Sequence, residues 1–297
     1  MEPRFGRVLT AMVTPFDASG NVDYDEAGRL AQWLVEHGSD GLVVTGTTGE
    51  SATLNREEKL RLYKTVRNAV GSEHKILAGT GSYDTSETVI LSLEAEETGV
   101  DGLLVVTPYY NKPSQEGLFQ HYKAVAEATD LPVVLYNVPA RTGVNLEAAT
   151  VLRLAEIENI VAVKEASLLL GQVGEIIAQA PAGFQVYGGS DEVNLLVLAL
   201  GGVGNISVIS HVIGPDLQKM HQAFFAGDYK TARCLHLGSL PMTKAMFSAP
   251  SPVPTKTALT MMDVLPGSRV RLPLVDANEK ERALIHTALK DYGLLRG

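Results

Sequence analysis

The chain has 297 residues, of which 45% are hydrophobic and 20% are charged, a composition typical of a folded globular protein. This length suits one large α/β barrel with a small appendage, or two ordinary domains. The net charge of -9 argues against a broad surface for nucleic acid or anionic membrane, and the single cysteine, Cys234, excludes an intrachain disulfide and a cysteine-rich metal site.

Neither the first residues nor the apolar runs carry a membrane signal. Residues 1–7 are polar and lack the apolar core of a signal peptide, and the apolar run 195–200 is far too short to cross a bilayer. A single cysteine also fits a reducing compartment. We therefore expect a cytoplasmic protein that neither spans nor binds a membrane.

Along most of the chain, apolar and β-branched runs alternate with segments of helical periodicity. The runs predict eight strands, at residues 8–14, 41–45, 75–78, 102–106, 132–136, 160–164, 184–187 and 204–207. Helices are expected between them, with the clearest signals at residues 24–37, after caps at Asn55 and Ser114, and from Thr85 and Asp191. This alternation predicts a (β/α)8 TIM barrel. A doubly wound open sheet fits less well, because no Gly-x-Gly-x-x-Gly opens the first helix and the chain is long for a single open sheet.

The alternation stops after Pro215, and the rest of the chain has helical periodicity. The pattern predicts helices at residues 217–225, 230–247, 256–262 and 278–292. A proline-rich stretch at 250–254 interrupts it, so the chain there is expected to be extended or turning. We predict two domains, a catalytic barrel at residues 1–227 and a helical domain at 228–297.

One predicted strand carries a lysine at its end. Residues 160–163 are apolar, and Lys164 follows them directly. This lysine could be structural, with its stem on the sheet and its ammonium in water or paired with Glu165. It could instead be a poorly hydrated amine that attacks a carbonyl and forms a Schiff base. The strand alone favours the structural role. The residues at the ends of the other predicted strands must decide between the two roles.

Polar side chains at the ends of other predicted strands would meet Lys164 at the same mouth of a barrel. Thr47 and Thr48 lie between two glycines, in a turn whose free N–H groups would suit a carboxylate. Tyr136 ends the fifth strand, where its phenol could move protons beside the lysine. Arg141 lies in the loop that follows, and its guanidinium matches a carboxylate. Each residue alone has an ordinary structural explanation, but together they favour a site.

The remaining candidates are weaker. Tyr109 and Tyr110 follow the fourth strand, and adjacent tyrosines more often pack or form an interface than catalyse. The 7 histidines show no metal-ligand spacing, so we interpret them as structural or solvated and expect no metal site. Asp40 and Asp101 precede strands and are expected to be turn residues at the opposite rim.

Four motifs then point to a family. They read Gly-Thr-Thr-Gly-Glu-Ser at 46–51, Tyr-Tyr-Asn-Lys-Pro at 109–113, Tyr-Asn-Val-Pro-Ala-Arg-Thr-Gly at 136–143 and Val-Lys-Glu at 163–165. With them, essentially the whole chain resembles the dihydrodipicolinate synthases of the pyruvate-dependent class I aldolase superfamily, including a tail with Ser-Pro-Val-Pro-Thr-Lys at 251–256. The resemblance implies a lyase that condenses pyruvate with L-aspartate 4-semialdehyde, in the synthesis of diaminopimelate and lysine.

The resemblance also implies roles for single residues. Lys164 would form an imine with pyruvate, and Tyr136 would donate and accept the protons. The other implied roles are a proton relay completed by Thr47 and Tyr110, a pyruvate carboxylate site at Thr48, a semialdehyde carboxylate site at Arg141, and a pocket lining made by main-chain groups of Gly189 and Ile206. No cofactor is implied, because the lysine amine supplies the electron sink by forming the imine.

The family also implies an assembly. The tyrosine that matches Tyr110 crosses a dimer interface in the family, and two dimers usually form a tetramer. We therefore expect a homotetramer, with no nucleic acid among its partners.

Related enzymes share part of this pattern. The N-acetylneuraminate lyases and the 2-keto-3-deoxy sugar acid aldolases share the lysine, the tyrosine and the glycine–threonine turn, but they lack an arginine at the position of Arg141. Arg141 therefore favours a synthase. A silent barrel that senses a keto acid is a third possibility, and the joint presence of Thr47, Tyr110, Tyr136 and Lys164 counts against it.

One departure from the family concerns feedback. Lysine-inhibited members bind lysine in a cleft at the dimer interface, where Ser51, Ala52, Glu87 and Tyr109 match the family. The regulatory asparagine is replaced here by Tyr83, and two usual histidines by Arg56 and Lys59. Since added bulk and positive charge disfavour a cationic effector, weak or absent inhibition by lysine is expected.

Overall fold

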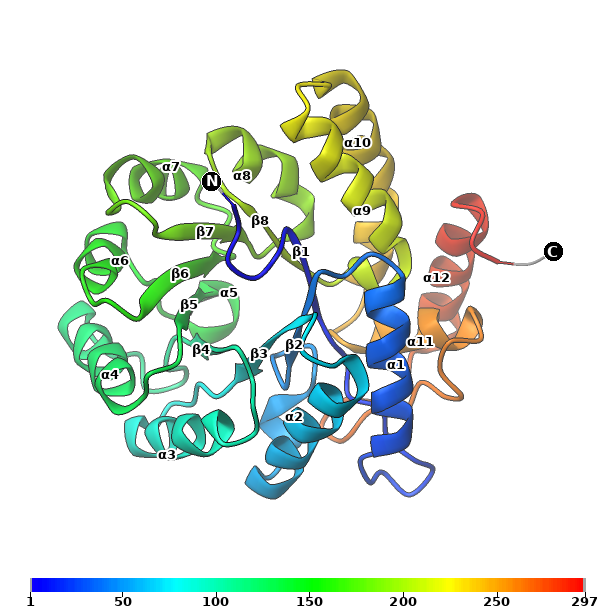
Figure 1. Ribbon diagram of the computed structural model, residues 1–297. Helices are drawn as coiled ribbons and strands as arrows, with labels where there is room; N and C mark the ends of the chain where they lie inside the picture. The colour runs from blue at the N-terminus through cyan, green and yellow to red at the C-terminus, as the bar shows by residue number, and fades with distance from the viewer. Residues whose placement is uncertain (1, 296–297) are drawn as a thin grey trace.

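The computed structural model describes residues 2–295, and its centre is a closed barrel of parallel strands in sequential order, β1 to β8 (Figure 1). The strands are β1 Val8–Ala11, β2 Gly41–Val44, β3 Lys75–Gly79, β4 Gly102–Val106, β5 Val133–Asn137, β6 Ile160–Glu165, β7 Gln185–Gly188 and β8 Gly204–Ser207. Strand β8 pairs with β1 and closes the ring. The predicted TIM barrel is confirmed, with β1 ending three residues earlier than expected.

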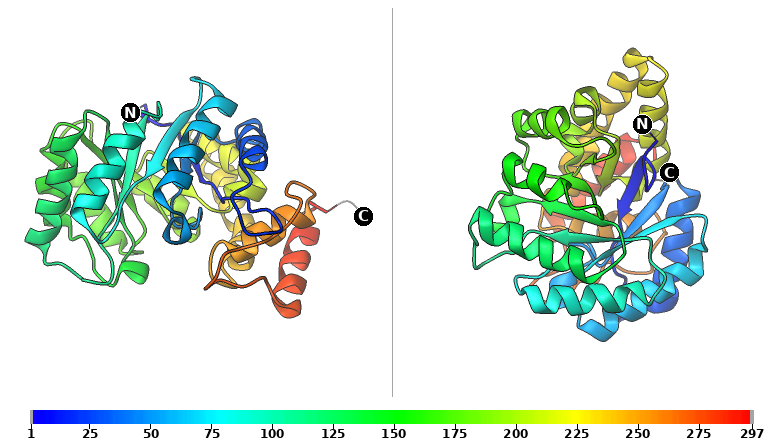
Figure 2. Two further views of the ribbon diagram at one scale, coloured as in Figure 1. Left: turned by 90° about the horizontal axis from the view of Figure 1, so that it is seen from below. Right: turned by 60° about the vertical axis from the view of Figure 1, so that its left-hand side comes forward.

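Helices surround the barrel and continue beyond it (Figures 1 and 2). They are α1 Tyr24–Glu36, α2 Arg56–Val70, α3 Thr85–Glu96, α4 Gln115–Ala128, α5 Pro139–Thr142, α6 Ala148–Ala155, α7 Leu170–Gln179, α8 Asn194–Leu200, α9 Ser210–Phe225, α10 Tyr229–Met246, α11 Val253–Met261 and α12 Glu279–Asp291, with short 3-10 turns η1 Ser51–Thr53 and η2 Asp191–Val193. No helix within residues 2–295 is both long enough and apolar enough to span a membrane.

The ends of several helices are set by side-chain caps that the sequence reveals. The carbonyl of the Asn55 side chain accepts the N–H of Glu58, whose carboxylate accepts the N–H of Asn55, so α2 begins with a capping box. Ser114 caps α4 in the same position. Asp84, one residue before the expected start at Thr85, caps α3.

The proline-rich stretch differs from the expectation. Instead of remaining extended or turning throughout 250–254, the chain enters α11 at Val253, with Pro254 in the first helical turn. The first-turn N–H groups of a helix have no partner inside the helix, so proline is tolerated there. Helix α9 also differs from the expected helix at 217–225, because it begins at Ser210 and contains Pro215. Its backbone bends at Ile213, two residues before the proline.

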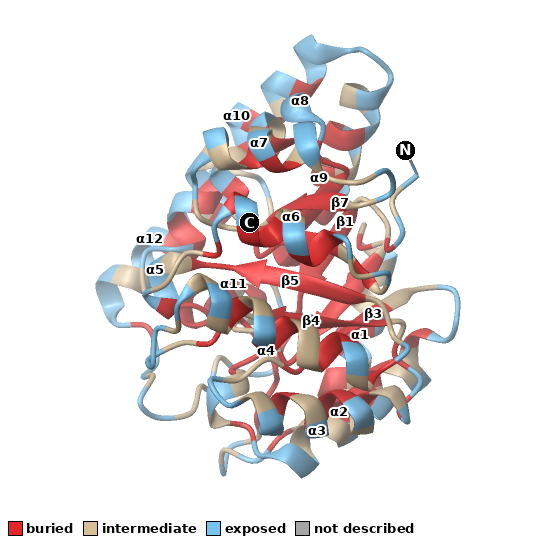
Figure 3. Cartoon of the chain, turned by 90° about the vertical axis from the view of Figure 1, so that its left-hand side faces the viewer, coloured by how far each residue is buried: buried red, intermediate tan, exposed pale blue. Residues whose placement is uncertain are grey.

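Three groups of buried apolar side chains hold the fold. One fills the barrel interior, a second lies between the strands and the surrounding helices, and a third joins α9, α10, α11 and α12. Figure 3 shows the buried strands and the exposed outer faces of the helices. Because α9 shares the third group with the later helices, the domain limits at 227 and 228 remain a prediction.

Candidate active site

Lys164 and Tyr136 lie side by side at the carboxyl ends of β6 and β5. They are register partners across the two parallel strands. The Nζ atom of Lys164 lies 4.3 Å from the centre of the Tyr136 ring, and the two residues are 5% and 6% exposed. The amine is therefore shielded from bulk water and lies over the ring of Tyr136.

The carboxylate next to this lysine has other partners. Glu165 accepts hydrogen bonds from Asn137 Nδ2 at 3.1 and 3.0 Å, from Gln172 Nε2 at 2.9 Å and from the backbone N–H of Ser167 at 2.7 Å. Asn137 is fully buried and also accepts the N–H of Leu146. This network ties the ends of β5 and β6 together, and so fixes the spacing of the lysine and the tyrosine.

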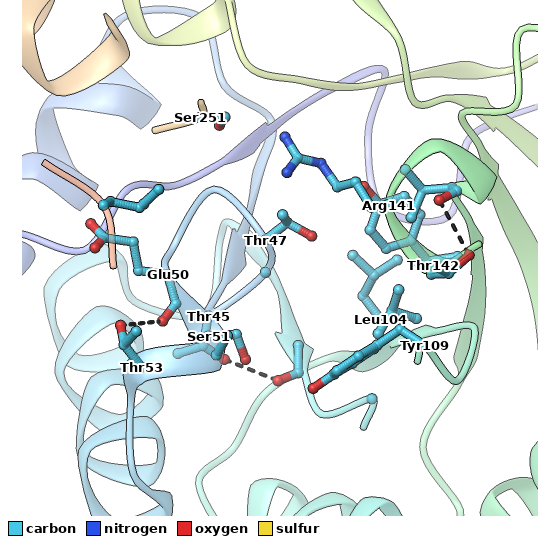
Figure 4. Close-up of a pocket in the computed structure, with 18 of the residues that line it drawn as sticks. Thr45, Thr47, Glu50, Ser51, Thr53, Leu104, Tyr109, Arg141, Thr142 and Ser251 are labelled. Carbon is cyan, nitrogen blue, oxygen red and sulfur yellow. Dashed lines mark hydrogen bonds between the residues drawn. The ribbon is translucent and has the colours of Figure 1, made fainter. Parts of the chain in front are cut away.

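A cavity of about 340 Å³ opens at the same end of the barrel. Thr47, Tyr136 and Arg141 line it, and Figure 4 shows Thr47 and the Arg141 guanidinium pointing into it. The Arg141 side chain extends from α5 toward the threonine turn (Figure 4). A small molecule bound here would meet a cation as well as hydroxyl and N–H groups.

Arg141 lies on a short helix, whereas the sequence suggested a loop. The helix, α5, starts with a proline at its first position and ends at Gly143, whose φ of 74° places it in the left-handed region. One helical turn bounded in this way fixes the backbone from which the exposed Arg141 side chain extends.

The glycine–threonine turn closes on itself. Gly49 N–H donates to Gly46 O at 3.0 Å, and Glu50 N–H donates to Thr47 O at 3.1 Å. Thr48 is 5% exposed within this turn, and the hydroxyl of Thr14 holds the carbonyl of Gly49 at 2.7 Å. Thr47 is thereby presented to the cavity from a fixed backbone.

Gly189 and Ile206 lie on the Lys164 side of the barrel. A Cβ atom on Gly189 would stand 3.0 Å from Cγ of Lys164 and 2.8 Å from Cβ of Ala166. Ile206 is 1% exposed and belongs to the barrel-interior group together with Tyr136. Gly189 therefore leaves the space that the lysine stem occupies.

Tyr110 lies apart from the other predicted residues. It is 90% exposed, its φ is 72°, and it is not among the residues that line the cavity. Tyr109 lines the cavity instead and packs edge-on against Tyr83, with ring centres 5.4 Å apart. Within residues 2–295 of one chain, the structure therefore does not bring Tyr110 together with Thr47 and Tyr136.

Several residues that line the cavity or support it were given no role from the sequence. Glu50, Ser251, Pro273 and Leu274 all line the cavity, and the last three come from the carboxyl-terminal part of the chain. Glu50 follows the glycine–threonine turn directly, which was a usable signal. Nothing in the local sequence marks Pro273 or Leu274, because only the tertiary fold carries them to the barrel.

The histidines are structural where they are most buried. Val13 N–H donates to Nε2 of His211 at 3.1 Å, so Nδ1 carries the proton and donates to Val208 O at 2.8 Å. Burial lowers the pKa of His211 to about 4, which keeps the ring neutral. Within residues 2–295, no group of three or more His, Cys, Asp or Glu is placed to hold a metal ion.

Comparison with known proteins agrees over the whole length. The model of the dihydrodipicolinate synthetase family matches residues 4–292. A 4-hydroxy-tetrahydrodipicolinate synthase of Moorella thermoacetica is 56% identical over 98% of this chain and 100% of its own length. One of Symbiobacterium thermophilum is 52% identical, over 99% of this chain and 100% of its own length.

Solved structures show the same likeness. A dihydrodipicolinate synthase of Bacillus anthracis has a TM-score of 0.95 at 48% identity, covering 98% of this chain and 99% of its own. A lysine-bound synthase of Cyanidioschyzon merolae has a TM-score of 0.96 at 43% identity, with the same coverage. The chain belongs to the dihydrodipicolinate synthetase family, and its activity is that of a 4-hydroxy-tetrahydrodipicolinate synthase, a lyase of lysine biosynthesis.

Proposed function

We propose that Lys164 is the residue on which this chain condenses pyruvate with L-aspartate 4-semialdehyde. The observation that carries the proposal is the buried amine of Lys164 against the ring of Tyr136, beside a cavity that Arg141 enters. An amine in this setting attacks the keto carbon of pyruvate, and loss of one water leaves an imine. The imine then withdraws electrons from the pyruvate methyl group, so that a proton can leave it.

The enamine formed in this way attacks the aldehyde carbon of the semialdehyde, and a carbon–carbon bond forms. The amino group of the semialdehyde next adds to the imine carbon and displaces the Lys164 amine, which closes the ring and frees the enzyme. Proton transfers accompany each step, and we assign them to the phenol of Tyr136, relayed through Thr47 and Tyr110.

The two carboxylates are proposed to bind at different places in the cavity. Thr48 and the free N–H groups of its turn suit the pyruvate carboxylate, which is held close to Lys164. The guanidinium of Arg141, which lines the same cavity, suits the carboxylate of the semialdehyde, because it can offer two parallel hydrogen bonds. Gly189 and Ile206 complete the wall on the lysine side.

The proposal extends to the assembly and the compartment. The 90% exposure of Tyr110 supports a site that a second chain completes, and we propose a homotetramer formed from two such dimers. We also propose a cytoplasmic enzyme, because the one cysteine, Cys234, is exposed and free, as suits a reducing compartment.

Trapping of the imine tests the proposal. Borohydride with pyruvate should add one pyruvate-derived mass to the peptide that contains Lys164, and omission of pyruvate should abolish it. The peptide with Lys256, a second buried lysine, is the internal control and should remain unmodified. Labelling elsewhere, or wild-type turnover by Lys164→Ala, would contradict the assignment. Assays with aspartate semialdehyde, N-acetylmannosamine and glyceraldehyde should show turnover with the first only.

A further inference from the structure

A buried ion pair joins the carboxyl-terminal helices to the active-site turn. Lys256, on α11, donates from Nζ to Oε1 of Glu50 at 2.6 Å, and the two side chains are 1% and 2% exposed. The other oxygen of Glu50 accepts the backbone N–H of Arg271 at 3.0 Å. Both oxygens of this carboxylate are thus held by the part of the chain that follows the barrel.

Glu50 ends the turn that carries Thr47 and Thr48, and its backbone is in an uncommon conformation. Its φ is 56°, in the left-handed region that residues other than Gly, Asn and Asp rarely adopt. Such a conformation persists only where the surroundings fix it. The contacts of its carboxylate supply that constraint, and the Thr14 hydroxyl holds the neighbouring Gly49 carbonyl from the β1 side.

The amine of Lys256 is fully engaged by its surroundings. Besides Glu50, it donates to the carbonyl of Arg269 at 2.8 Å, and it lies 4.1 Å from the ring centre of Phe16. Burial lowers the pKa of Lys256 to about 8, against the opposing effect of Glu50. These contacts leave it no room to act as a second nucleophile.

Arg271 fastens the same segment to the barrel. Its guanidinium donates to both oxygens of Glu58 on α2, at 2.9 and 2.6 Å, and to the carbonyl of Thr53 at 2.8 Å. Two residues later, Pro273 and Leu274 reach the cavity wall. The segment is therefore held at the cavity as well as at Glu50.

Stability does not explain why this pair is buried. A buried ion pair gains little over well-packed apolar side chains of the same volume, since both charges lose their water. Its specific effect is geometric, because a carboxylate held by two donors permits one orientation. That orientation belongs here to the residue next to the threonine turn.

We propose that Lys256 is a positioning residue for the condensation: through Glu50 it fixes the turn in which Thr47 and Thr48 face the substrate. The inference rests on the proposed function, in which Thr48 binds the pyruvate carboxylate and Arg141, on the separate element α5, binds the semialdehyde. Loss of the pair should then affect pyruvate and the proton relay, and spare the semialdehyde site.

The test compares Michaelis constants for the two substrates. Lys256→Met should raise the KM for pyruvate about tenfold and lower kcat by a similar factor, while the KM for aspartate semialdehyde stays within about twofold. A merely structural role would reduce the amount of active enzyme and leave both KM values unchanged. The matched control is Lys219→Met, which removes an exposed ion pair with Asp216 on α9 and should change neither constant.

Two further variants keep the test decisive. Glu50→Gln keeps the size of the side chain, and Glu50→Leu with Lys256→Leu replaces the pair by apolar side chains that need no partner. Both variants should remain folded, as shown by a cooperative melting transition, and both should still show the selective rise in the KM for pyruvate. Unchanged pyruvate KM in any folded variant would overturn the inference, and so would failure of all variants to fold, because the role would then be structural.

Borohydride trapping separates this outcome from the proposed function. Wild-type protein should be labelled at Lys164, and Lys256→Met should be labelled at the same residue but at higher pyruvate concentrations. Absence of labelling in the wild type would refute the proposed chemistry. Normal labelling of the wild type together with an unshifted pyruvate dependence in Lys256→Met would refute only the positioning role.

Discussion

At the scale of single residues, the surroundings of Lys164 matter more than the lysine itself. The chain has a second buried lysine, Lys256, which is occupied by a carboxylate and a carbonyl. Lys164 instead faces the ring of Tyr136, while its neighbour Glu165 is bound by amides. Because no ion pair within residues 2–295 occupies the Lys164 amine, we assign the reaction with the substrate carbonyl to it and not to Lys256.

Gly189 offers a sharp test of this arrangement. Gly189→Ala would place a methyl group against Cγ of Lys164 and Cβ of Ala166, both at 3.0 Å or closer, so the lysine stem must shift. We expect kcat to fall at least about tenfold and the free energy of unfolding to fall by about 1–3 kcal/mol. Kinetics and urea unfolding measure the two effects.

The matched control is Gly171→Ala on α7, where an added Cβ meets nothing within 4 Å. Alanine favours helix, so this variant should be as stable as the wild type or slightly more so, with normal activity. Wild-type kcat in Gly189→Ala would show that the lysine stem tolerates displacement.

The substitutions at the candidate lysine cleft give a second prediction at this scale. Arg56 forms an ion pair with Glu94, Lys59 is half-buried, and Tyr83 packs against Tyr109. A cationic effector would meet the charge of Lys59, an arginine already paired with a carboxylate, and a bulky ring, so we predict weak or absent inhibition by lysine. An inhibition curve for lysine at fixed substrate concentrations measures it.

Half-maximal inhibition at submillimolar lysine would contradict that prediction. The converse experiment combines Tyr83→Asn, Arg56→His and Lys59→His, which restores the family pattern at these positions. This triple variant should become more sensitive to lysine than the wild type.

At the scale of elements, short strands are held in place by polar contacts at their ends. The carboxylate of Asp191 accepts the hydroxyl of Ser207 at 2.6 Å and the backbone N–H groups of Val208 and Ile209 at 2.9 and 3.1 Å. His211 then links the start of α9 to Val13, just beyond β1. These contacts join the last strand of the barrel to the first.

The link through His211 predicts a dependence of stability on pH. The pKa of His211 is lowered to about 4 by burial, against 6.5 for an ordinary histidine. Below about pH 6.5 the unfolded chain therefore binds a proton that the folded chain refuses, and stability is lost as the pH falls toward 4. From the size of the pKa change, this residue alone should lower the free energy of unfolding by about 2 kcal/mol between pH 7 and pH 5.

Urea unfolding at both pH values, at one protein concentration, tests this prediction. His211→Gln retains an acceptor for the Val13 N–H but has no titrating group, so it should lose about 2 kcal/mol of the pH dependence. An unchanged pH dependence in this variant would assign the effect to other groups.

At the scale of the whole molecule, the exposed Tyr110 predicts that activity depends on assembly. We expect sedimentation of a species four times the chain mass of 31.8 kDa at micromolar concentration. If the proposed dimer shares the site, dilution that dissociates it should reduce kcat per chain, because each cavity would lose the Tyr110 phenol of the neighbouring chain.

Tyr110→Phe should lower kcat about 10²-fold or more, without loss of the assembly, since it removes only the proton-carrying hydroxyl. Tyr229→Phe, at a 65% exposed position on α10, is the control and should be fully active. A fully active monomer, or wild-type turnover by Tyr110→Phe, would contradict the proposed sharing of the site.

The sequence alone determined the order of the strands, the caps at Asn55 and Ser114, and the strand ends at or near Thr47, Tyr136 and Lys164, but not the short helix α5. These features are local: periodicity, a capping side chain or a glycine near a strand end acts within a few residues. Eight strands that alternate with helices are typical of a closed parallel barrel, so the alternation also predicted the barrel and the end at which the strand ends meet.

Only the tertiary structure decided which distant residues meet at that mouth. Glu50 and Lys256 are 206 positions apart, and neither has a local pattern that marks the other as its partner. The same holds for Pro273 and Leu274, which reach the cavity because the later helices pack against α9. Burial of apolar faces sets that packing, and it depends on the shape of whole surfaces that no short stretch of sequence contains.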